Sequence, residues 1–307
     1  MVTDGCWQDV DGDGRLDLVL VGEWMPITVF RNEGGGRLKR LAVPGLEQSD
    51  GWWNRIVAGD FTGDGRVDFI AGNLGENGGL NATRTAPTTM IVKDFDENGS
   101  FEQILTATSQ GRRYLLSLRD DLLRALPMLS KRLPTYASYA GKSVEDVFTP
   151  AELQDAVVRQ AYTFATTLVR NEGNGRFTLV PLPREAQLAP VHGILATDVD
   201  RDGHTDLLLA GNFDGFRPEI GRMAASYGLL LRGDGRGGFT PSPATESGFF
   251  VPGQSRDIQG LRTAAGATYI VSRNGEKPVL FRAGGRGKGN NLAARAAAAR
   301  TAQRPSR

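Results

Sequence analysis

The chain has 307 residues with 36 basic and 35 acidic side chains, and its net charge of +1 conceals an uneven distribution. The last 26 residues hold seven lysines and arginines and no acid, which leaves 29 basic against 35 acidic residues in positions 1–281. The single cysteine, Cys6, excludes an intrachain disulfide, and the chain lacks the run of about 18 apolar residues that a membrane-spanning helix needs.

A phrase of nine residues rich in aspartate and glycine recurs four times, beginning at Asp9, Asp60, Asp94 and Asp198. Positions 1, 3 and 5 of such a tight loop can turn three side chains onto one calcium ion. The glycine at position 6 permits a sharp turn, so that the carbonyl of position 7 and the carboxylate of position 9 complete the shell of oxygens. We therefore predict up to four Ca²⁺ sites. The predicted ligands are Asp9, Asp11, Asp13, the Arg15 carbonyl and Asp17; Asp60, Thr62, Asp64, the Arg66 carbonyl and Asp68; Asp94, Asp96, Asn98, the Ser100 carbonyl and Glu102; and Asp198, Asp200, Asp202, the His204 carbonyl and Asp206.

The second and third copies depart from the pattern. Thr62 replaces a carboxylate in the second, and Asn98 and Glu102 replace aspartates in the third, so we expect weaker or more selective binding there. An Asp/Gly-rich turn can also bind nothing, because these residues favour turns in any case. Four copies in register favour calcium.

Each loop leads into a strand rather than a helix, since residues 16–21, 67–71 and 205–210 are β-rich apolar runs that end near glycine. Further strands and Asn-x-Gly or Gly-Asp-Gly turns follow, for example at residues 27–38, 167–177 and 229–239. Units of about 40–50 residues with four strands are typical of β-propeller blades. The sequence predicts an all-β propeller with about five such units, the last at residues 256–275 without a calcium loop. We expect residues 1–7 to be too few to supply strands before the first loop.

The spacing between loop starts is 51, 34 and 104 residues, so the last interval must hold something extra. Leucines recur there at helical spacing from Leu115 to Leu129, and Thr149-Pro150-Ala151-Glu152 has the form of a capping box with proline at the first helical position. We predict a helical insertion over about residues 112–162, within the third blade. It acts either as a packing cap or as a lid over a ligand site, and a leucine stripe favours the cap.

Beyond residue 281 the chain becomes rich in Gly, Arg and Ala, which predicts a disordered basic tail over residues 282–307 after propeller blades at 1–281. We expect this tail to be solvated and expect that the chain has no nucleic-acid partner. The chain does not begin with a basic and then an apolar segment, so we expect no signal peptide in it.

Several polar and aromatic residues outside the loops allow either a structural or a functional interpretation. The four tryptophans, Trp7, Trp24, Trp52 and Trp53, could form a platform for sugar rings, although packing between blades is favoured. Asn73 and Asn212, each after a glycine at a strand end, could hydrogen-bond the loops or line the central channel of the propeller. Glu219 and Arg222 form either a functional polar patch or a simple ion pair.

The repeats resemble FG-GAP or VCBS-type repeats, the blades of integrin-α-like propellers. In fuller wording they resemble bacterial VCBS-repeat proteins of the cartilage-acidic-protein-like, ASPIC/UnbV-associated group. The resemblance covers nearly everything from Trp7 to Phe281. It rests on VGEWMP at 21–26, GWWN at 51–54, AGNLG at 71–75, the stretch from LPTY to YA at 133–140, GN at 211–212 and PEIGR at 218–222. It implies a secreted or surface-exposed, calcium-stabilised propeller without a defined catalytic activity, and this chain as the C-terminal part of a longer protein.

Two functions remain open at this stage. The first is a non-catalytic binding or adhesion module, monomeric or part of a longer chain, for a protein or glycan at the cell surface, in the periplasm or outside the cell. The second is the propeller domain of a polysaccharide lyase or hydrolase. The sequence contains no nucleophile elbow, HExxH motif or phosphate loop, and outside the metal loops no carboxylate pair that it can bring together, which favours the binding module.

Overall fold

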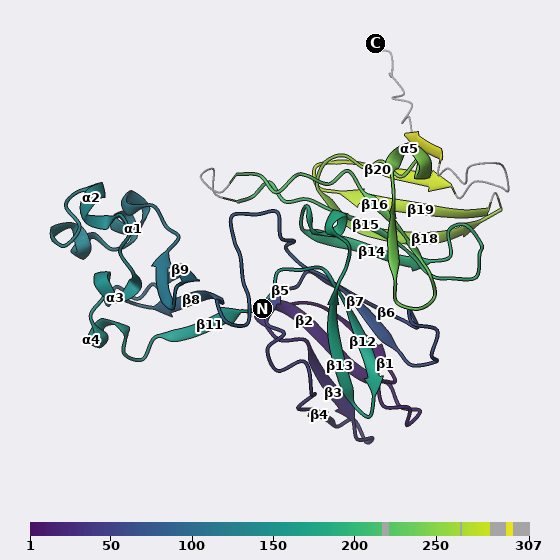
Figure 1. Cartoon of the computed structure of the whole chain (residues 1–307), viewed down its shortest axis with the longest axis horizontal. Helices are drawn as coiled ribbons and strands as arrows, with labels where there is room; N and C mark the ends of the chain where they lie inside the picture. Colours follow the sequence, from purple (N-terminus) through teal and green to yellow (C-terminus); the bar gives the residue numbers. More distant parts are fainter. Residues whose placement is uncertain (217–220, 265, 283–292, 297–307) are drawn as a thin grey trace, which may run out of the picture. The chain divides into compact units, whose positions relative to one another are not determined.

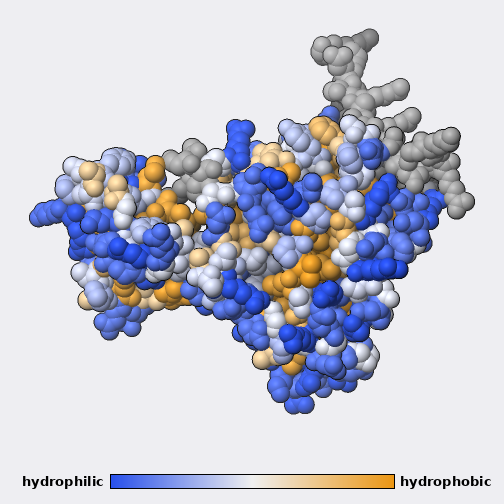
Figure 2. All heavy atoms as spheres, viewed as in Figure 1, coloured by the Kyte–Doolittle hydropathy of each residue, from blue (hydrophilic) through white to orange (hydrophobic). Residues whose placement is uncertain are grey.

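A computed structural model of the chain describes residues 1–216, 221–264, 266–282 and 293–296 (Figure 1). The chain divides into two compact units. Unit 1 consists of Met1–Trp53, Gly78–Phe164 and Asn174–Leu179, and unit 2 consists of Asn54–Asn77, Ala165–Gly173 and Val180–Arg307. Five antiparallel sheets form within the described residues, in agreement with the predicted all-β class. Hydrophilic side chains cover most of the surface visible in Figure 2.

Sheet 1 lies in unit 1 and begins with the strand that precedes the first loop. Strand β1 pairs with β2 from Gln8 opposite Asp17 to Val2 opposite Gly22. The expectation that residues 1–7 are too few for a strand is therefore wrong. The first loop joins β1 and β2 into a hairpin, and pairing begins directly at the loop, with Asp17 as its last residue. The strands are β1 Val2–Gln8, β2 Asp17–Met25, β3 Thr28–Asn32 and β4 Leu38–Arg40 in that order, with β5 Gly51–Trp52 on the far end of β2.

Sheet 2 is assembled from two segments far apart in the sequence. Strands β6 and β7 flank the second loop, and β12 then pairs with β7, with Thr167 opposite Ala71. Residues 73–166 thus lie between two adjacent strands of one sheet. The strands at 167–181 complete the sheet of the second loop, not that of the third. The strands are β6 Arg55–Gly59, β7 Asp68–Gly72, β12 Thr167–Gly173 and β13 Arg176–Pro181.

Sheet 3 lies in unit 1 and contains the third loop. Its strand order is β10-β9-β8-β11, so the last strand in the chain, β11, forms an edge of the sheet and pairs with β8. The predicted helical insertion over residues 112–162 is too long, because both of its ends are strands of this sheet. The strands are β8 Thr88–Lys93, β9 Glu102–Ser109, β10 Arg112–Leu115 and β11 Val157–Ala161.

Most of the described helices lie in the connection between β10 and β11, and most of these are only one turn long. The predicted capping box is present: the Glu152 N–H donates to Thr149 Oγ1 at 3.3 Å, and the Thr149 N–H donates to Glu152 Oε2 at 2.7 Å. Leu126, which is fully buried, packs in one cluster with Ile91 and Ile104 of the sheet. The leucine stripe is therefore the core of this part. The helices are α1 Arg119–Ala125, η1 Pro127–Lys131, α2 Tyr136–Tyr139, α3 Val144–Val147 and α4 Pro150–Leu153.

Sheets 4 and 5 lie in unit 2 and each has four strands in chain order. Sheet 5 has the strand pattern predicted for a unit without a calcium loop. Of the predicted tail, Ala293–Ala296 form β21, paired with β20, whereas residues 283–292 and 297–307 lie outside the described part of the chain. Sheet 4 consists of β14 Val191–Thr197, β15 Asp206–Gly211, β16 Leu229–Gly233 and β17 Phe239–Ser242, and sheet 5 of β18 Ser255–Thr263, β19 Gly266–Arg273, β20 Glu276–Arg282 and β21 Ala293–Ala296; η2 Arg184–Gln187 and α5 Ala244–Ser247 are short connections.

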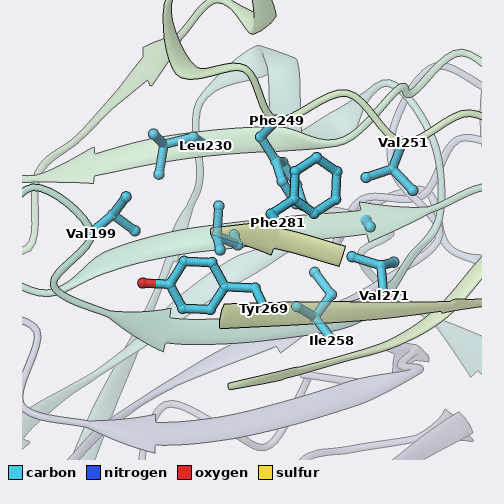
Figure 3. Packing of buried hydrophobic residues seen from close by; sticks show 10 residues of the cluster. Val199, Leu230, Phe249, Val251, Ile258, Tyr269, Val271 and Phe281 are labelled. Atoms are coloured by element: carbon cyan, nitrogen blue, oxygen red, sulfur yellow. The ribbon is translucent and has the colours of Figure 1, made fainter. Parts of the chain in front are cut away.

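Both faces of sheet 4 are buried. Successive side chains of a strand point to opposite sides of the sheet, and in β15 the side chains on each side belong to a different apolar cluster. Leu207 and Leu209 of β15 share a cluster with Ile70 of sheet 2. Leu208, between them, belongs to a second cluster that includes Phe281 of sheet 5. Figure 3 shows this second cluster between the strands of sheets 4 and 5. Sheet 4 is thus packed between sheets 2 and 5, through residues that all belong to unit 2.

Among the helices that the structure describes, none is both long enough and apolar enough to cross a bilayer.

Candidate metal centres

All four aspartate-rich loops occupy the same place in their sheets: each connects the two strands of a hairpin. The residue before position 1 pairs with position 9 in every case, as Gln8 with Asp17, Gly59 with Asp68, Lys93 with Glu102 and Thr197 with Asp206. The sequence copies therefore correspond to one repeated local structure.

The first aspartate of each loop organises the backbone of the turn. In the first loop, Asp9 Oδ1 accepts the Gly12 N–H and Oδ2 accepts the Gly14 N–H, both at 2.8 Å. Asp60 and Asp198 accept N–H groups from the same two positions of their own loops, and Asp94 accepts those of Asn98 and Gly99, at positions 5 and 6. The glycine at position 6 has φ of +82°, +82°, +87° and +93° in the four loops, a region that favours glycine, as the sharp turn predicted.

Position 7 was predicted to offer its carbonyl, and the structure adds a contact for its N–H. That N–H donates to the side chain at position 5 in each loop, at 2.7–2.9 Å. The pairs are Arg15 with Asp13, Arg66 with Asp64, Ser100 with Asn98, and His204 with Asp202.

The last carboxylate of three loops is almost completely buried and ties the loop to the third strand of its sheet. Asp17 accepts the Val10 N–H at 3.1 Å and the Asn32 N–H at 2.8 Å. Asp68 and Asp206 make the equivalent contacts, to Asn171 and Gly233 among others. Burial raises the pKa of the Asp68 and Asp206 carboxyls, while these hydrogen bonds act in the opposite direction.

The partners Asn32, Asn171 and Gly233 were missed as site residues by the sequence analysis. They stand at the same point of the repeated closing phrase, directly after an arginine, and that recurrence was the available signal. In the third loop, Glu102 Oε2 accepts the Phe95 N–H at 3.0 Å, so the longer side chain reaches the same kind of position at the start of its loop.

Three of the four loops bring three carboxylates together, with oxygen atoms within 4.8 Å of one another. In the first and fourth loops the group is smaller than predicted, because Asp17 and Asp202 are outside it. The second loop is not among such groups in the described part of the chain. The groups are Asp9, Asp11 and Asp13; Asp94, Asp96 and Glu102; and Asp198, Asp200 and Asp206.

The second loop satisfies its carboxylates internally. The Thr62 hydroxyl donates to Asp68 Oδ2 at 3.0 Å, where the other loops have a carboxylate at position 3. Arg66 Nη2 donates to Asp64 Oδ2 at 2.5 Å, and Arg66 Nε donates to the Asn171 carbonyl at 3.0 Å. Arg15 makes the same two contacts in the first loop, to Asp13 and to the Asn32 carbonyl, so the Thr62–Asp68 hydrogen bond is the contact that sets the second loop apart.

The third loop provides the clearest test of whether a metal ion fits. Asp96 Oδ1 is buried and has no hydrogen-bond partner among the described residues, and it belongs to the carboxylate group with Asp94 and Glu102. A buried carboxylate oxygen without a partner is costly unless a cation or a donor satisfies it. The oxygen donors are of the type that Ca²⁺ prefers, so the residues fit a calcium ion.

The tryptophans do not form one platform. Trp53 is fully buried and donates its Nε1–H to the Ser49 carbonyl at 2.9 Å, which is a packing role. Trp24 and Trp52 are half-buried and meet edge to face, with ring centroids 5.2 Å apart. Trp7 is 53% exposed on β1.

The two asparagines after strand-end glycines hold backbone in place. Asn73 is fully buried, and its Nδ2 donates to the Ala165 carbonyl at 3.4 Å. Asn212 donates to the carbonyls of Ser226 and Gly253 at 2.6 and 2.8 Å. Of the predicted polar pair, Glu219 lies outside the described residues.

A pocket that the sequence did not predict opens in unit 1 beside β3 and β4. It has a volume of about 360 Å³ and is lined by residues 26–28, 40–43, 46 and 47. Ile27, Val43 and Leu46 form an apolar base, and Arg40 and Glu47 supply opposite charges. The volume is at the lower end of the range for small-ligand sites.

Comparison with known families agrees with this arrangement. Residues 9–71, which contain the first and second loops, match the family model described as an FG-GAP-like repeat. A search of curated proteins found no match. The resemblance inferred from the sequence is confirmed over this stretch, and the chain carries an FG-GAP-like repeat at residues 9–71.

Proposed function

We propose that the chain is a calcium-stabilised, non-catalytic binding module that acts outside the cytoplasm on a protein or glycan. The observation that carries the proposal is the convergence of three carboxylates at the same hairpin position in the first, third and fourth loops. Like charges held this close repel one another unless a cation neutralises them. Extracellular calcium is abundant enough to fill sites of modest affinity.

The bound ion would have a structural role. In the third loop Asp94, Asp96 and Glu102 would hold it, and in the fourth Asp198, Asp200 and Asp206. The ion would neutralise these carboxylates, while in the fourth loop the Gly233 N–H, which donates to Asp206, fixes the loop to the neighbouring strand. A ligand that binds only the folded state stabilises it by RT ln(1 + [L]/Kd), about 2.7 kcal/mol at a hundredfold excess over Kd.

A propeller architecture accounts for the stacking in unit 2. Sheets 2, 4 and 5 share two apolar clusters through opposite faces of sheet 4, as successive blades do. We propose that these sheets are blades of a closed propeller. Sheet 3, with its different strand order and its helical connection, is an elaboration between β7 and β12.

The distribution of charged and apolar groups supports the proposed binding role. The loops present exposed polar backbone at hairpin ends, and the pocket beside β3 and β4 offers an apolar base with Arg40 and Glu47. Such a surface suits the recognition of a protein or glycan segment. Substitution of Arg40 by Glu is the first variant to compare with the unaltered chain on a glycan array and in a protein-capture screen.

The test of the calcium role is thermal unfolding of the full chain in EDTA and across a calcium titration, with metal stoichiometry from native mass spectrometry. We expect bound calcium and a rise in Tm of several degrees or more. Asp96→Asn should reduce the stoichiometry by one ion, and Asp120→Asn, on an exposed part of α1, is the matched control. An unchanged Tm with no retained ion would refute the calcium role.

A further inference from the structure

Arg232 on β16 forms an ion pair with Asp200, the residue at position 3 of the fourth loop. Its side chain is 34% exposed and that of Asp200 16% exposed, so the pair is partly shielded from water. Asp200 also belongs to the carboxylate group with Asp198 and Asp206. A guanidinium from another strand therefore lies at one of the carboxylates that would hold the cation.

The equivalent arginines of the other repeats have different partners. Arg31 and Arg170 also precede the residue whose N–H donates to the position-9 aspartate. Each forms an ion pair with the glutamate two residues further on: Arg31 with Glu33 at 3.3 Å and Arg170 with Glu172 at 2.7 Å.

Sheet 4 has an aspartate instead of that glutamate, and its carboxylate is used elsewhere. Asp234 Oδ1 accepts the N–H groups of Arg236 and Gly238 at 2.7 and 2.9 Å, inside the turn before β17. The shorter side chain thus stabilises the turn, and Arg232 pairs with Asp200 of the loop.

We propose that Arg232 is an affinity-determining residue of the fourth loop, an internal counter-ion that competes with the divalent cation for Asp200. The proposal rests on the calcium role proposed above. A cation that enters the loop must displace Arg232 from Asp200, and it is then repelled by the guanidinium nearby. Both effects weaken calcium binding. The arginine in turn neutralises the loop when the cation is absent.

The sequence alone predicts the opposite order of affinities. The fourth loop has aspartate at positions 1, 3, 5 and 9, whereas the third has asparagine and glutamate at two of these. No arginine contacts the carboxylates of the third loop among the described residues, and its Asp96 Oδ1 lacks a partner. Removal of Arg232 should strengthen one site and leave the others unchanged.

Calcium binding to the full chain should be measured by isothermal titration calorimetry for the unaltered protein, Arg232→Ala and Arg232→Gln. We expect one site to bind about three- to tenfold more tightly in both variants, from the loss of one nearby positive charge. Arg232→Lys, which keeps the charge, should stay close to the unaltered protein. Arg170→Ala is the matched control, because the equivalent arginine there pairs with Glu172.

Assignment of the tightened site uses Asp198→Asn, which removes a ligand of the fourth loop only. The gain in affinity should disappear when Asp198→Asn is combined with Arg232→Ala. Calcium binding with the same affinities in the unaltered protein, Arg232→Ala and Arg232→Gln would overturn the role of Arg232 while leaving the calcium role intact. No binding to any of them would overturn both. The far-UV circular dichroism of each variant verifies its fold.

Discussion

Removal of the Asp68 carboxylate tests whether position 9 of the loops stabilises the fold without a metal ion. Asp68 is fully buried and accepts hydrogen bonds from the Phe61 and Asn171 backbone N–H groups and from the Thr62 hydroxyl. A hydrogen bond to a charged group contributes about 1.5–3 kcal/mol, and buried donors left without partners add to the loss. Because the carboxylate also loses solvation on burial, Asp68→Ala should lower the free energy of unfolding by about 3–4 kcal/mol.

The assay is chemical unfolding of the full chain followed by tryptophan fluorescence, once in EDTA and once in excess calcium. The loss should be the same in both conditions, since the second loop satisfies its carboxylates with protein groups. Asp64→Ala, at the exposed position 5 of the same loop, should change the free energy by less than about 1 kcal/mol in either condition. A loss that appears only in calcium would refute the reasoning, because it would make Asp68 a metal ligand first.

Three further outcomes are expected. Burial lowers the pKa of His192 to about 4 from 6.5, so its protonation opposes folding, and stability present above pH 6.5 should be lost progressively as pH falls towards 4; His192→Phe should flatten this part of the pH profile of Tm. Leu126→Ala, in the core of sheet 3 and its helices, should lower the free energy of unfolding by about 2–5 kcal/mol, whereas Leu118→Ala, 45% exposed, should change it little, as monitored by urea unfolding. Burial raises the pKa of the Cys6 thiol to about 11, so labelling by a thiol reagent at pH 8 should be slow and should accelerate on unfolding, and fast labelling of the folded chain would contradict this.

The local structure of the loops follows from the sequence because every contact that shapes them is short in range. Asp9 reaches N–H groups three to five residues ahead, and the glycine at position 6 supplies the positive φ. The loop-to-strand order and the capping box at Thr149 are local in the same way, and these predictions are confirmed.

The pairing of distant strands does not follow from such patterns. Any strand of the repeat presents the same alternation. An insertion over residues 112–162 within the third blade implies that residues 167–177 close that blade, whereas Thr167 pairs with Ala71 in the sheet of the second loop. The interval of 34 residues between the second and third loop starts was the available sign, being too short for a unit of four strands.

The sequence by itself determined the all-β class, the repeated aspartate-rich loops and the FG-GAP resemblance, since these depend on residue type and spacing within a few turns of chain. Only the tertiary structure decided which carboxylates converge, that Thr62 closes the second loop, and that Arg232 contacts Asp200 across 32 residues. Where a side chain has several candidate partners of similar charge, the arrangement of the strands determines which partner lies within reach. That geometry is set by sheet register and stacking, which spacing along the chain does not encode.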